Sequence, residues 1–423
     1  MRVLMVSANT ERINMPTPPL GAAMVAAAAR AHGHEVELLD LLSTADPAAA
    51  VRDAVARCRP EVIGVSVRNI DDQKMAQPDF LLDKAAAVVR ACREAGPAPL
   101  VLGGAGYSIF PVPALEYLGG DFGVAGEGEI AFPALLEALA AGGDPAGVPG
   151  VVARGRNAPV PPSKPARLDE LPSPYADLGR CLDLADPGLW VPVQTRRGCP
   201  LDCTYCSTPQ IEGRALRKRS PALVADELAR LADAGAARFH FVDNTFNLPP
   251  SYALELCREI ISRGRTIAWR AIVYPHQVSD ELVEAMAEAG CAEVSIGSES
   301  CCDPILGSLN KRFSAAEVSD VVRRFARAGI TRYGFLLLGV PGETRETVAE
   351  SLEAADALDL SVLKITIGVR IYPFTPLARQ AAAEGVVAPD DDLLRPRFYM
   401  APAVAGWVEE AVRSRDWATT VWL

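Results

Sequence analysis

Three cysteines in one short loop are the residues best suited to chemistry. The segment from Arg196 to Cys206 places Cys199, Cys203 and Cys206 in a C-x3-C-x2-C pattern. Three thiolates cannot pair off into an even set of disulfides, but a short loop can turn them toward one soft metal centre. A zinc site would want a fourth protein ligand, and the loop offers no further His or Cys. The spacing therefore favours a [4Fe–4S] cluster with one open iron, and the alternative is three unrelated buried cysteines.

Length and charge narrow the class of protein. A chain of 423 residues is expected to form two or three domains. A net charge of −11 argues against nucleic acid as the main partner. The chain starts at Met1 directly with a strand pattern, and no charge-free apolar stretch is long enough to span a membrane. With 10 cysteines and no secretory signal, we expect reduced thiols and a cytoplasmic location.

The first 150 residues alternate apolar strands with helices, which predicts a doubly wound parallel sheet of the Rossmann-like kind. Strands are expected at 2–7, 35–39, 62–67, 99–102 and 121–125, and helices at 20–32, 48–58, 80–95, 112–118 and 129–141. Ligands of such sheets bind beyond the carboxyl ends of the strands. The loops at those ends are 9–21, 68–72, 103–108 and 126–129, and each alone also fits ordinary turn chemistry.

The cysteine motif, with Tyr205 before its third cysteine, resembles that of the radical S-adenosylmethionine (SAM) superfamily. The resemblance implies that Cys199, Cys203 and Cys206 hold a [4Fe–4S] cluster whose open iron binds the amino and carboxylate groups of SAM. Reductive cleavage of SAM would then give a 5′-deoxyadenosyl radical. The backbone of Tyr205 is expected near adenine. An electron donor such as flavodoxin or ferredoxin is the implied protein partner.

The rest of the chain fits this resemblance. Residues 151–189 are proline-rich and predict an extended, semi-rigid linker. From 190 to 385 the alternation resumes, with strands expected at 191–195, 238–242, 267–273, 293–296, 334–338 and 365–371. These six βα units correspond to the partial (β/α)6 barrel of the superfamily, in which chemistry lies on the loops after the strands. Residues 386–423 form a short C-terminal segment.

The resemblance also implies SAM contacts on the loops that follow the barrel strands. Asp243 and Asn244 end the second strand, where a carboxylate would face the SAM ammonium. Ser295 and Glu299 lie around the end of the fourth strand and are candidates for the ribose or carboxylate end of SAM. Val340 lies in the turn after the fifth strand, expected near adenine. No catalytic side chain is assigned.

The four N-terminal loops together resemble the cobalamin-binding domain that precedes the radical SAM domain in one large subfamily. The resemblance rests on the segments Pro18-Pro19-Leu20-Gly21, Gly33-His34-Glu35-Val36, Gly103-Gly104 and Gly126-Glu127-Gly128-Glu129. The implied cobalamin contacts are Pro18, Leu20, Gly21, Arg68, Asn69, Gly103, Gly104, Gly106, Tyr107, Glu127, Gly128 and Glu129. The Asp-x-His-x-x-Gly motif that supplies a cobalt ligand elsewhere is absent, and Gly106 stands where a histidine is often seen. The axial ligand of cobalt stays open.

Three further features have local interpretations. A basic run precedes the predicted N-cap Ser220 and is expected to be a solvated face, with a contact to SAM or cobalamin as the alternative. Its members are Arg214, Arg217, Lys218 and Arg219. Phe374, where the family often has glycine, is expected to pack. The aromatic tail after Val386 is expected to cover the barrel mouth and form one wall of the substrate site.

The two domains together predict a cobalamin-dependent radical SAM enzyme. We expect methylation of an unactivated carbon of a small molecule or peptide in specialised metabolism. One alternative is an enzyme of the same architecture that catalyses cyclisation, ring contraction or dehydration without methyl transfer. Another is a non-enzymatic iron–sulfur sensor, against which the completeness of the SAM loops argues. No nucleic acid and no membrane are expected as partners.

Overall fold

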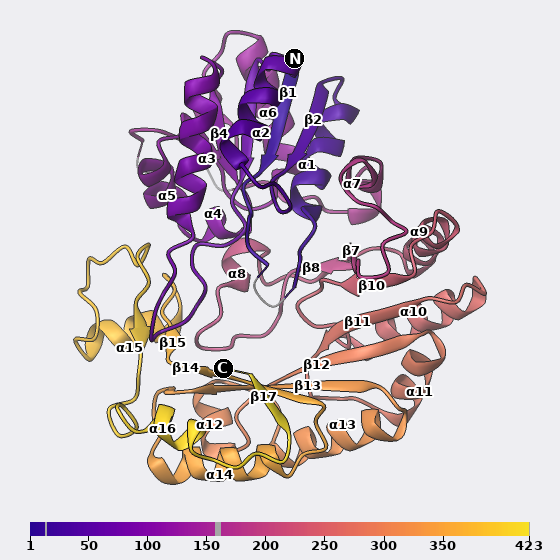
Figure 1. The fold of residues 1–423 in the computed structure, drawn as a ribbon, viewed down its shortest axis with the longest axis vertical. Coiled ribbons are helices and arrows are strands. Elements are labelled where there is room, and N and C mark those ends of the chain that lie inside the picture. Colours follow the sequence, from indigo (N-terminus) through magenta and orange to yellow (C-terminus); the bar gives the residue numbers. More distant parts are fainter. Residues whose placement is uncertain (13–14, 157–161, 423) are drawn as a thin grey trace.

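The computed structural model describes residues 1–12, 15–156 and 162–422. Figure 1 shows an N-terminal α/β unit above an open, curved sheet whose helices cover its outer side. Residues 13–14, in the loop after the first strand, and 157–161, which include two of the linker prolines, lie outside the described residues. No helix of the described residues is long and apolar enough to cross a membrane.

The N-terminal sheet is doubly wound, as predicted. Its strand order is β2-β1-β3-β4-β5-β6, and all neighbours pair in parallel except β5 and β6. The strands are β1 (Arg2–Ser7), β2 (Glu35–Asp40), β3 (Val62–Ser66), β4 (Leu100–Gly103), β5 (Phe122–Val124) and β6 (Val151–Ala153). The strand order reverses between β1 and β3, so a crevice for a ligand opens at their carboxyl ends.

Helices cover both faces of this sheet. They are α1 (Leu20–Ala31), α2 (Pro47–Cys58), α3 (Leu82–Ala95), α4 (Ala105–Ile109), α5 (Pro111–Leu118) and α6 (Gly128–Ala140). Alternate residues of β1 enter different cores: Val3 and Met5 pack with α1 and α6, whereas Leu4 and Val6 pack with α2 and α3. This two-residue alternation is what a strand buried on both faces requires.

The predicted linker is only partly an extended connector. Its first residues form β6, which completes the N-terminal sheet, and residues Tyr175–Cys181 form helix α7. Asp177 of α7 is buried and pairs with Arg30 of α1 at 2.7 Å. Pro174 is the N-cap of α7, a position at which proline starts a helix without losing a hydrogen bond. The linker therefore packs against the first domain at both ends.

The second sheet is the predicted partial barrel with one added strand. Its order is β17-β14-β13-β12-β11-β10-β7, and every pairing is parallel. The strands are β7 (Val191–Val193), β10 (Arg238–Phe241), β11 (Ala268–Val273), β12 (Cys291–Glu299), β13 (Thr331–Leu338), β14 (Val362–Ile367) and β17 (Thr420–Trp422). The C-terminal tail thus extends the sheet beside β14, and the ring of Trp422 lies 6.0 Å from that of Tyr333.

The outer helices and the short elements complete the barrel. The helices are α9 (Pro221–Asp233), α10 (Pro250–Ser262), α11 (Asp280–Glu288), α12 (Asp303–Ser308), α13 (Ala315–Arg327), α14 (Arg345–Asp356), α15 (Pro376–Ala383) and α16 (Val408–Arg413). The short elements are β8 (Arg196–Arg197), α8 (Thr208–Ile211), β9 (Arg217–Lys218), β15 (Val369–Arg370) and β16 (Phe398–Tyr399). The prediction that Phe374 packs is wrong: it is 82% exposed and has a left-handed backbone φ of 62°.

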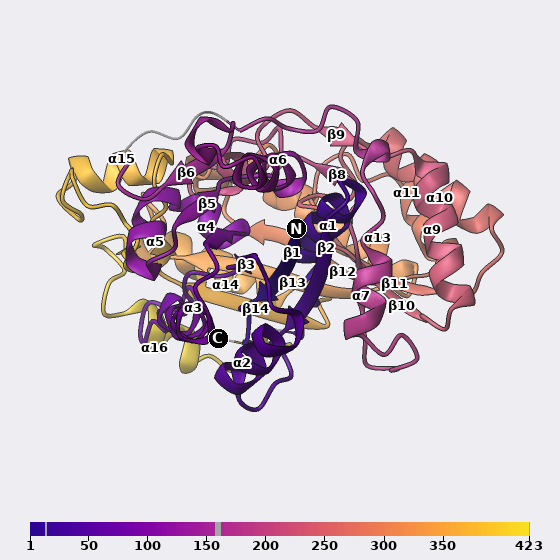
Figure 2. The same cartoon turned by 90° about the horizontal axis from the view of Figure 1, so that it is seen from above.

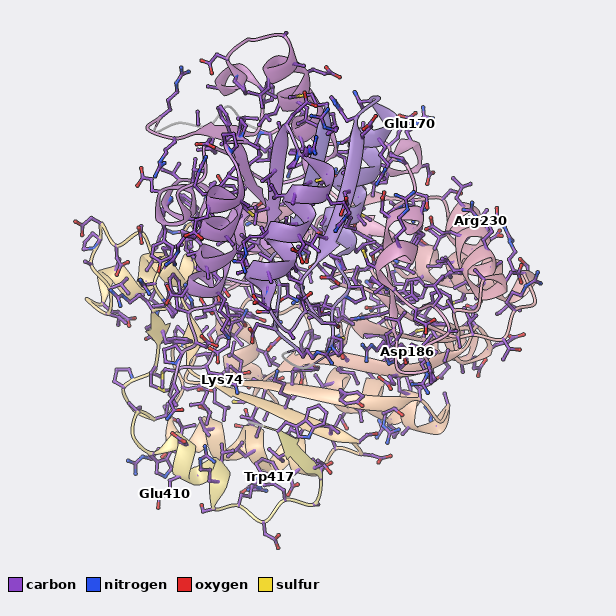
Figure 3. The ribbon with its side chains drawn as sticks, turned by 45° about the horizontal axis from the view of Figure 1, so that its top comes forward. Lys74, Glu170, Asp186, Arg230, Glu410 and Trp417 are labelled. Atoms are coloured by element: carbon purple, nitrogen blue, oxygen red, sulfur yellow. The ribbon has the colours of Figure 1, made fainter. Side chains whose placement is uncertain are left out.

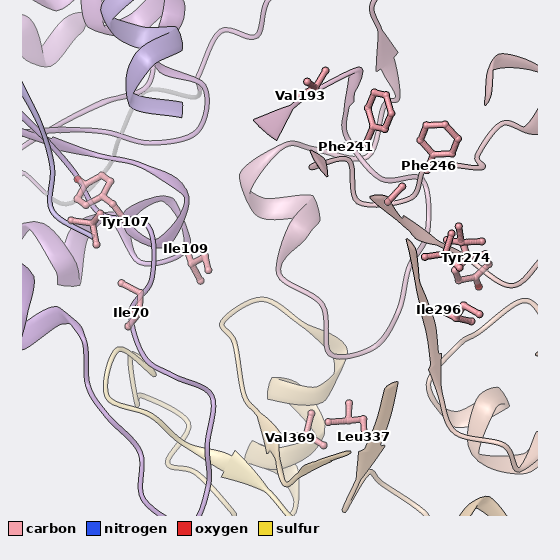
Figure 4. Packing of buried hydrophobic residues seen from close by; sticks show 14 of the residues in the cluster. Ile70, Tyr107, Ile109, Val193, Phe241, Phe246, Tyr274, Ile296, Leu337 and Val369 are labelled. Atoms are coloured by element: carbon pink, nitrogen blue, oxygen red, sulfur yellow. The ribbon is translucent and has the colours of Figure 1, made fainter. Parts of the chain in front are cut away.

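The two units share one hydrophobic cluster and a buried ion pair. Figure 4 shows Tyr107 and Ile109 of the first unit and Phe241 and Phe246 of the barrel as parts of that cluster. The loop after β3 descends to the barrel, where Asp71 pairs with buried Arg370 at 2.7 Å. In Figure 3, Lys74 of the same loop lies beside the barrel sheet. Glu410 and Trp417 lie on the C-terminal segment.

Candidate functional site

The cysteine loop follows β7 and lies between the two units. Cys199, Cys203 and Cys206 are free thiols, and burial raises the pKa of Cys199 to about 11. Gly198 has a φ of 88°, and a Cβ there would lie 2.2 Å from the carbonyl oxygen of Ala215, so glycine is required. Among the described residues, no three His, Cys, Asp or Glu side chains are set to hold a single metal ion. Three lone thiolates suit a cluster, in which each binds its own iron.

A chain of hydrogen bonds ties the cysteine loop to β10. The Sγ of Cys206 lies 3.3 Å from Oγ1 of Thr208, which contacts Oδ1 of Asn244 at 3.4 Å. Asn244 donates to Glu212 at 2.7 Å, and Glu212 also accepts the backbone N–H of Gly198 at 2.9 Å. The predicted SAM residue Asn244 therefore reaches the cysteine loop, and Glu212 is a neighbour that the sequence analysis did not identify.

Asp243 lies behind the loop. It is 1% exposed, and its carboxylate accepts the backbone N–H groups of Thr195 and Arg196 at 2.8 and 3.2 Å and the Thr195 hydroxyl at 2.5 Å. Its second oxygen lies 3.4 Å from Nε of Arg196. These donors use the carboxylate to fix the turn from β7 into the loop. The contact of Asp243 with the SAM ammonium stays a prediction. The hydrogen bonds that already occupy its carboxylate disfavour that contact.

Lys311, which the sequence analysis missed, is a buried cation beside the cysteine loop. Its side chain is 4% exposed, and Nζ lies 3.0 Å from the hydroxyl of Tyr205 and 3.4 Å from Oε1 of Glu299. The rings of Tyr205 and Tyr274 lie 5.4 and 5.9 Å from it. Burial alone would lower the pKa of Lys311, but Glu299 and Cys203 outweigh it, so its pKa is raised. The ammonium stays charged beside the cluster ligands.

The remaining predicted SAM residues lie on the inner side and at the carboxyl end of the barrel. Ser295 pairs with Tyr333 in the register of β12 and β13, and it alternates with buried core residues. Glu299 ends β12 with a left-handed φ of 64°. The Val340 side chain is fully buried, so only its backbone can meet a ligand.

Glu343 lies in the turn that carries Val340, and it makes the stability of the fold depend on pH. Its carboxylate accepts the N–H groups of Gly339 and Val340, and burial raises its pKa to about 7. An acid with a raised folded-state pKa stabilises the fold at low pH, and this contribution is lost as the pH rises through 7. We therefore expect Glu343→Gln to raise the melting temperature at pH 8 by a few degrees and to leave it unchanged near pH 4. Equal melting temperatures at pH 8, read by calorimetry, would contradict this.

A cavity of about 370 Å³ lies at the carboxyl ends of β1, β3 and β4 and faces the barrel. Nine predicted cobalamin residues line it: Pro18, Leu20, Gly21, Arg68, Gly103, Gly104, Glu127, Gly128 and Glu129. Three do not: Asn69 borders a smaller cavity, Gly106 packs on the backbone of Arg68, and Tyr107 is fully buried against Gly123. The barrel contributes Pro192, Gln194, Arg197, Ile211, Glu212 and Val242.

Part of this cavity is an apolar slot of the kind that the tail of the predicted cobalamin would need. It continues from the strand ends along the face of the sheet beneath α1 and α6, between Met5, Gly64, Val101 and Phe132, as an apolar slot for an elongated group. At the mouth, Gly104 has a φ of 100°, and a Cβ there would lie 2.5 Å from the carbonyl oxygen of Val67. Glycine alone permits the turn that brings this backbone to the cavity.

Arg197 of the cysteine motif joins the two units through ion pairs in the wall of this cavity. It contacts Glu127 at 2.8 Å and Glu129 at 2.5 Å, and these three side chains are at most 6% exposed. Arg217 also binds Glu127, at 2.8 Å. Burial acts to raise the pKa of Glu127, but the two arginines bring it below its usual value. We call Arg197, Arg217, Glu127 and Glu129 the interdomain ion cluster.

Two family models match the chain. Residues 6–136 match the B12 binding domain, and residues 193–355 match the radical SAM superfamily. The first match contains the strands β2, β3, β4 and β5 and the last two residues of β1, and the second contains the three cysteines. The two sides of the interdomain ion cluster therefore belong to different matched domains.

Curated relatives and solved structures cover most of the chain. It is 27% identical to tryptophan 2-C-methyltransferase of Streptomyces laurentii, over 89% of this chain and 74% of that protein. It is 26% identical to cytidylyl-2-hydroxyethylphosphonate methyltransferase of Streptomyces wedmorensis, over 92% and 83%. Its fold is similar to that of TsrM, a radical SAM methyltransferase from Kitasatospora setae solved with tryptophan and aza-SAM, with a TM-score of 0.81, 28% identity and coverage of 90% and 76%.

Proposed function

We propose that this chain, a radical SAM enzyme with an N-terminal B12-binding domain, transfers a methyl group from SAM to an unactivated carbon of a small molecule. The observation that carries this proposal is the joint wall of the cavity. Residues of the B12-binding domain and residues that flank the first cluster cysteine line one space. A methyl carrier bound there would face the radical site. The relatives whose names state a methyl transfer support the same reaction.

The protein's own part in this reaction is to bind, orient and exclude water. When bound, the cluster, SAM and cobalamin supply the electron, the methyl group and the carbon chemistry. Cys199, Cys203 and Cys206 would hold the cluster, and the slot beneath α1 and α6 would hold the tail of cobalamin. Asp71 with Arg370 and the interdomain ion cluster keep the two cofactor sites facing each other.

We assign SAM recognition to groups around the cysteine loop. The buried ammonium of Lys311 suits the SAM carboxylate, because it is charged, desolvated and next to the ligand Cys203. The backbone of Val340 suits adenine, and Asn244, which reaches the loop, suits the polar end of SAM. In this arrangement Glu299 orients Lys311.

The substrate would lie on the inner side of the barrel, with the C-terminal tail as a side wall. This modifies the expected lid, since β17 continues the sheet beside β14. A cytoplasmic setting is proposed because all ten cysteines are free. The reductant is proposed to be a one-electron carrier protein.

The proposal is tested by the fate of SAM. The anaerobic enzyme with cluster and cobalamin is incubated with SAM and titanium(III) citrate, and products are read by mass spectrometry. We expect S-adenosylhomocysteine to form only when cobalamin is present. If 5′-deoxyadenosine forms alone, with or without cobalamin, the enzyme catalyses a radical reaction without methyl transfer and the proposal fails.

Gly104→Ala is expected to weaken cobalamin binding about fivefold to a hundredfold, because left-handed strain and the contact with Val67 together cost about 1–3 kcal/mol. Gly103→Ala is the matched control: its Cβ would lie 3.6 Å from the nearest atom, an ordinary contact. Hydroxocobalamin affinity, measured by equilibrium dialysis, decides. If the two variants bind hydroxocobalamin with equal affinity, the loop that contains Gly103 and Gly104 is not part of the binding site.

A further inference from the structure

Exposed cations lie at the turn that hydrogen-bonds to the backbone of the cluster ligand Cys199. The backbone N–H of Cys199 donates to the carbonyl of Gly213 at 3.0 Å, and the next residue, Arg214, is exposed. A Cβ on Gly213 would lie 2.3 Å from Nζ of Lys164, so this ammonium sits on the same turn. One turn of chain therefore separates the ligand from a charged surface.

The surplus charge comes from two segments that lie side by side. Residues 162–168 and 213–220 hold six basic and no acidic residues, in a chain of net charge −11. Arg217 joins them through a hydrogen bond to the carbonyl of Pro165 at 3.0 Å. Strand β9 lies near one edge of the molecule, as Figure 2 shows from above. The segments thus form a local positive region on a negative protein.

Only part of this charge is neutralised. Arg217 and Arg219 turn inward to Glu127 and Glu227, and Arg167 pairs with Glu170. The other three basic residues of the two segments are exposed and make no ion pair within the described part of the chain. They are Lys164, Arg214 and Lys218. The nearby Asp169 accepts the backbone N–H of Ser220. We call Lys164, Arg214 and Lys218 the basic patch.

The other approach to the cysteine loop is electrostatically neutral. There the loop reaches the surface at Asp202, which pairs with Arg312 at 3.0 Å. The side chain of Asn310 also contacts the loop there, where it donates a hydrogen bond to the carbonyl of Asp202 at 3.1 Å. The charges at Asp202 are thus paired, whereas the turn at Gly213 carries cations that make no ion pair within the described residues.

We propose that the basic patch is the docking surface for an acidic one-electron carrier protein of the flavodoxin or ferredoxin kind. The inference rests on the proposed function, since that function requires a reduced cluster. A positive patch speeds the encounter with a negative partner and orients it. With flavodoxin, the hydroquinone anion loses one electron and becomes the neutral semiquinone. The cluster gains that electron and passes from the 2+ to the 1+ state, and no proton moves.

The test compares a triple charge reversal with a matched control. The first variant is Lys164→Glu, Arg214→Glu, Lys218→Glu. The control reverses three exposed arginines on the outer helices α2, α3 and α14: Arg52, Arg90 and Arg345. Cluster reduction by reduced flavodoxin and by dithionite is followed by stopped flow, and the affinity for oxidised flavodoxin is measured by calorimetry.

At low salt we expect the patch variant to be reduced by flavodoxin about ten- to a hundredfold more slowly than wild type, with weaker binding. Its reduction by dithionite should equal wild type, which shows that the cluster is intact. Flavodoxin should reduce the control variant at close to the wild-type rate. Equal flavodoxin rates in patch variant and wild type, or an equal loss in the control, would overturn the proposal. S-adenosylhomocysteine formation with titanium(III) citrate tests the proposed function separately, because that route needs no docking.

Discussion

Replacing Arg197 with methionine should destabilise the protein by about 3–5 kcal/mol, because it leaves the buried carboxylate of Glu129 without a cation. Glu127 keeps Arg217, so the loss falls mainly on one ion pair. The cysteine loop would also lose its attachment to the B12-binding domain. We therefore expect cobalamin affinity and iron content to fall together. Thermal unfolding of the apoprotein, equilibrium dialysis with hydroxocobalamin and iron analysis measure these effects.

A second substitution separates charge from packing. In Arg197→Met with Glu129→Gln both charges are removed, and a neutral pair of similar volume costs little. This double variant should recover most of the lost stability. Arg214→Met, which changes an exposed arginine of the same region, should unfold like wild type. If Arg197→Met alone unfolds at the wild-type temperature, the interdomain ion cluster does not hold the two units together.

Replacing Lys311 with methionine should weaken SAM binding by about tenfold to a hundredfold, because a hydrogen bond to a charged group contributes about 1.5–3 kcal/mol. The cluster should still assemble, since Lys311 is not a ligand and the three cysteines are untouched. Equilibrium dialysis with labelled SAM, with iron analysis on the same sample, gives both quantities.

Arg312→Met is the matched control for Lys311. It removes the neighbouring cation, whose pair with Asp202 is solvent-exposed and so contributes little. We expect SAM affinity to be unchanged in this variant. Wild-type SAM affinity in Lys311→Met, with full iron content, would exclude Lys311 from SAM recognition.

The sequence predicted the regular elements well because their signals are local. The apolar run of β3 and the six βα units of the barrel both appear as expected. The missed elements depend on distant partners. Strand β17 exists because Thr420 to Trp422 pair with β14, and β6 exists because it pairs with β5. Helix α7 was hidden by the prolines around it, although Pro174 stands where a helix can begin.

The site was predicted in part. The cysteines and most cavity-lining loops follow from spacing and resemblance. The roles of charged residues do not, since burial and pairing are tertiary. Arg217 and Arg219 were expected in a solvated face, but they are largely buried on Glu127 and Glu227. Lys311 carries no local signal, because only the fold brings it to Tyr205.

The most direct test of the account is the metal content of the reconstituted protein. The chain is reconstituted anaerobically with iron, sulfide and hydroxocobalamin, and its ultraviolet–visible spectrum is recorded with iron and cobalt analysis. The account predicts about four iron atoms and about one cobalt atom per chain. Four iron atoms without cobalt would contradict the two-cofactor site between the domains and leave a radical SAM enzyme whose N-terminal domain has another role.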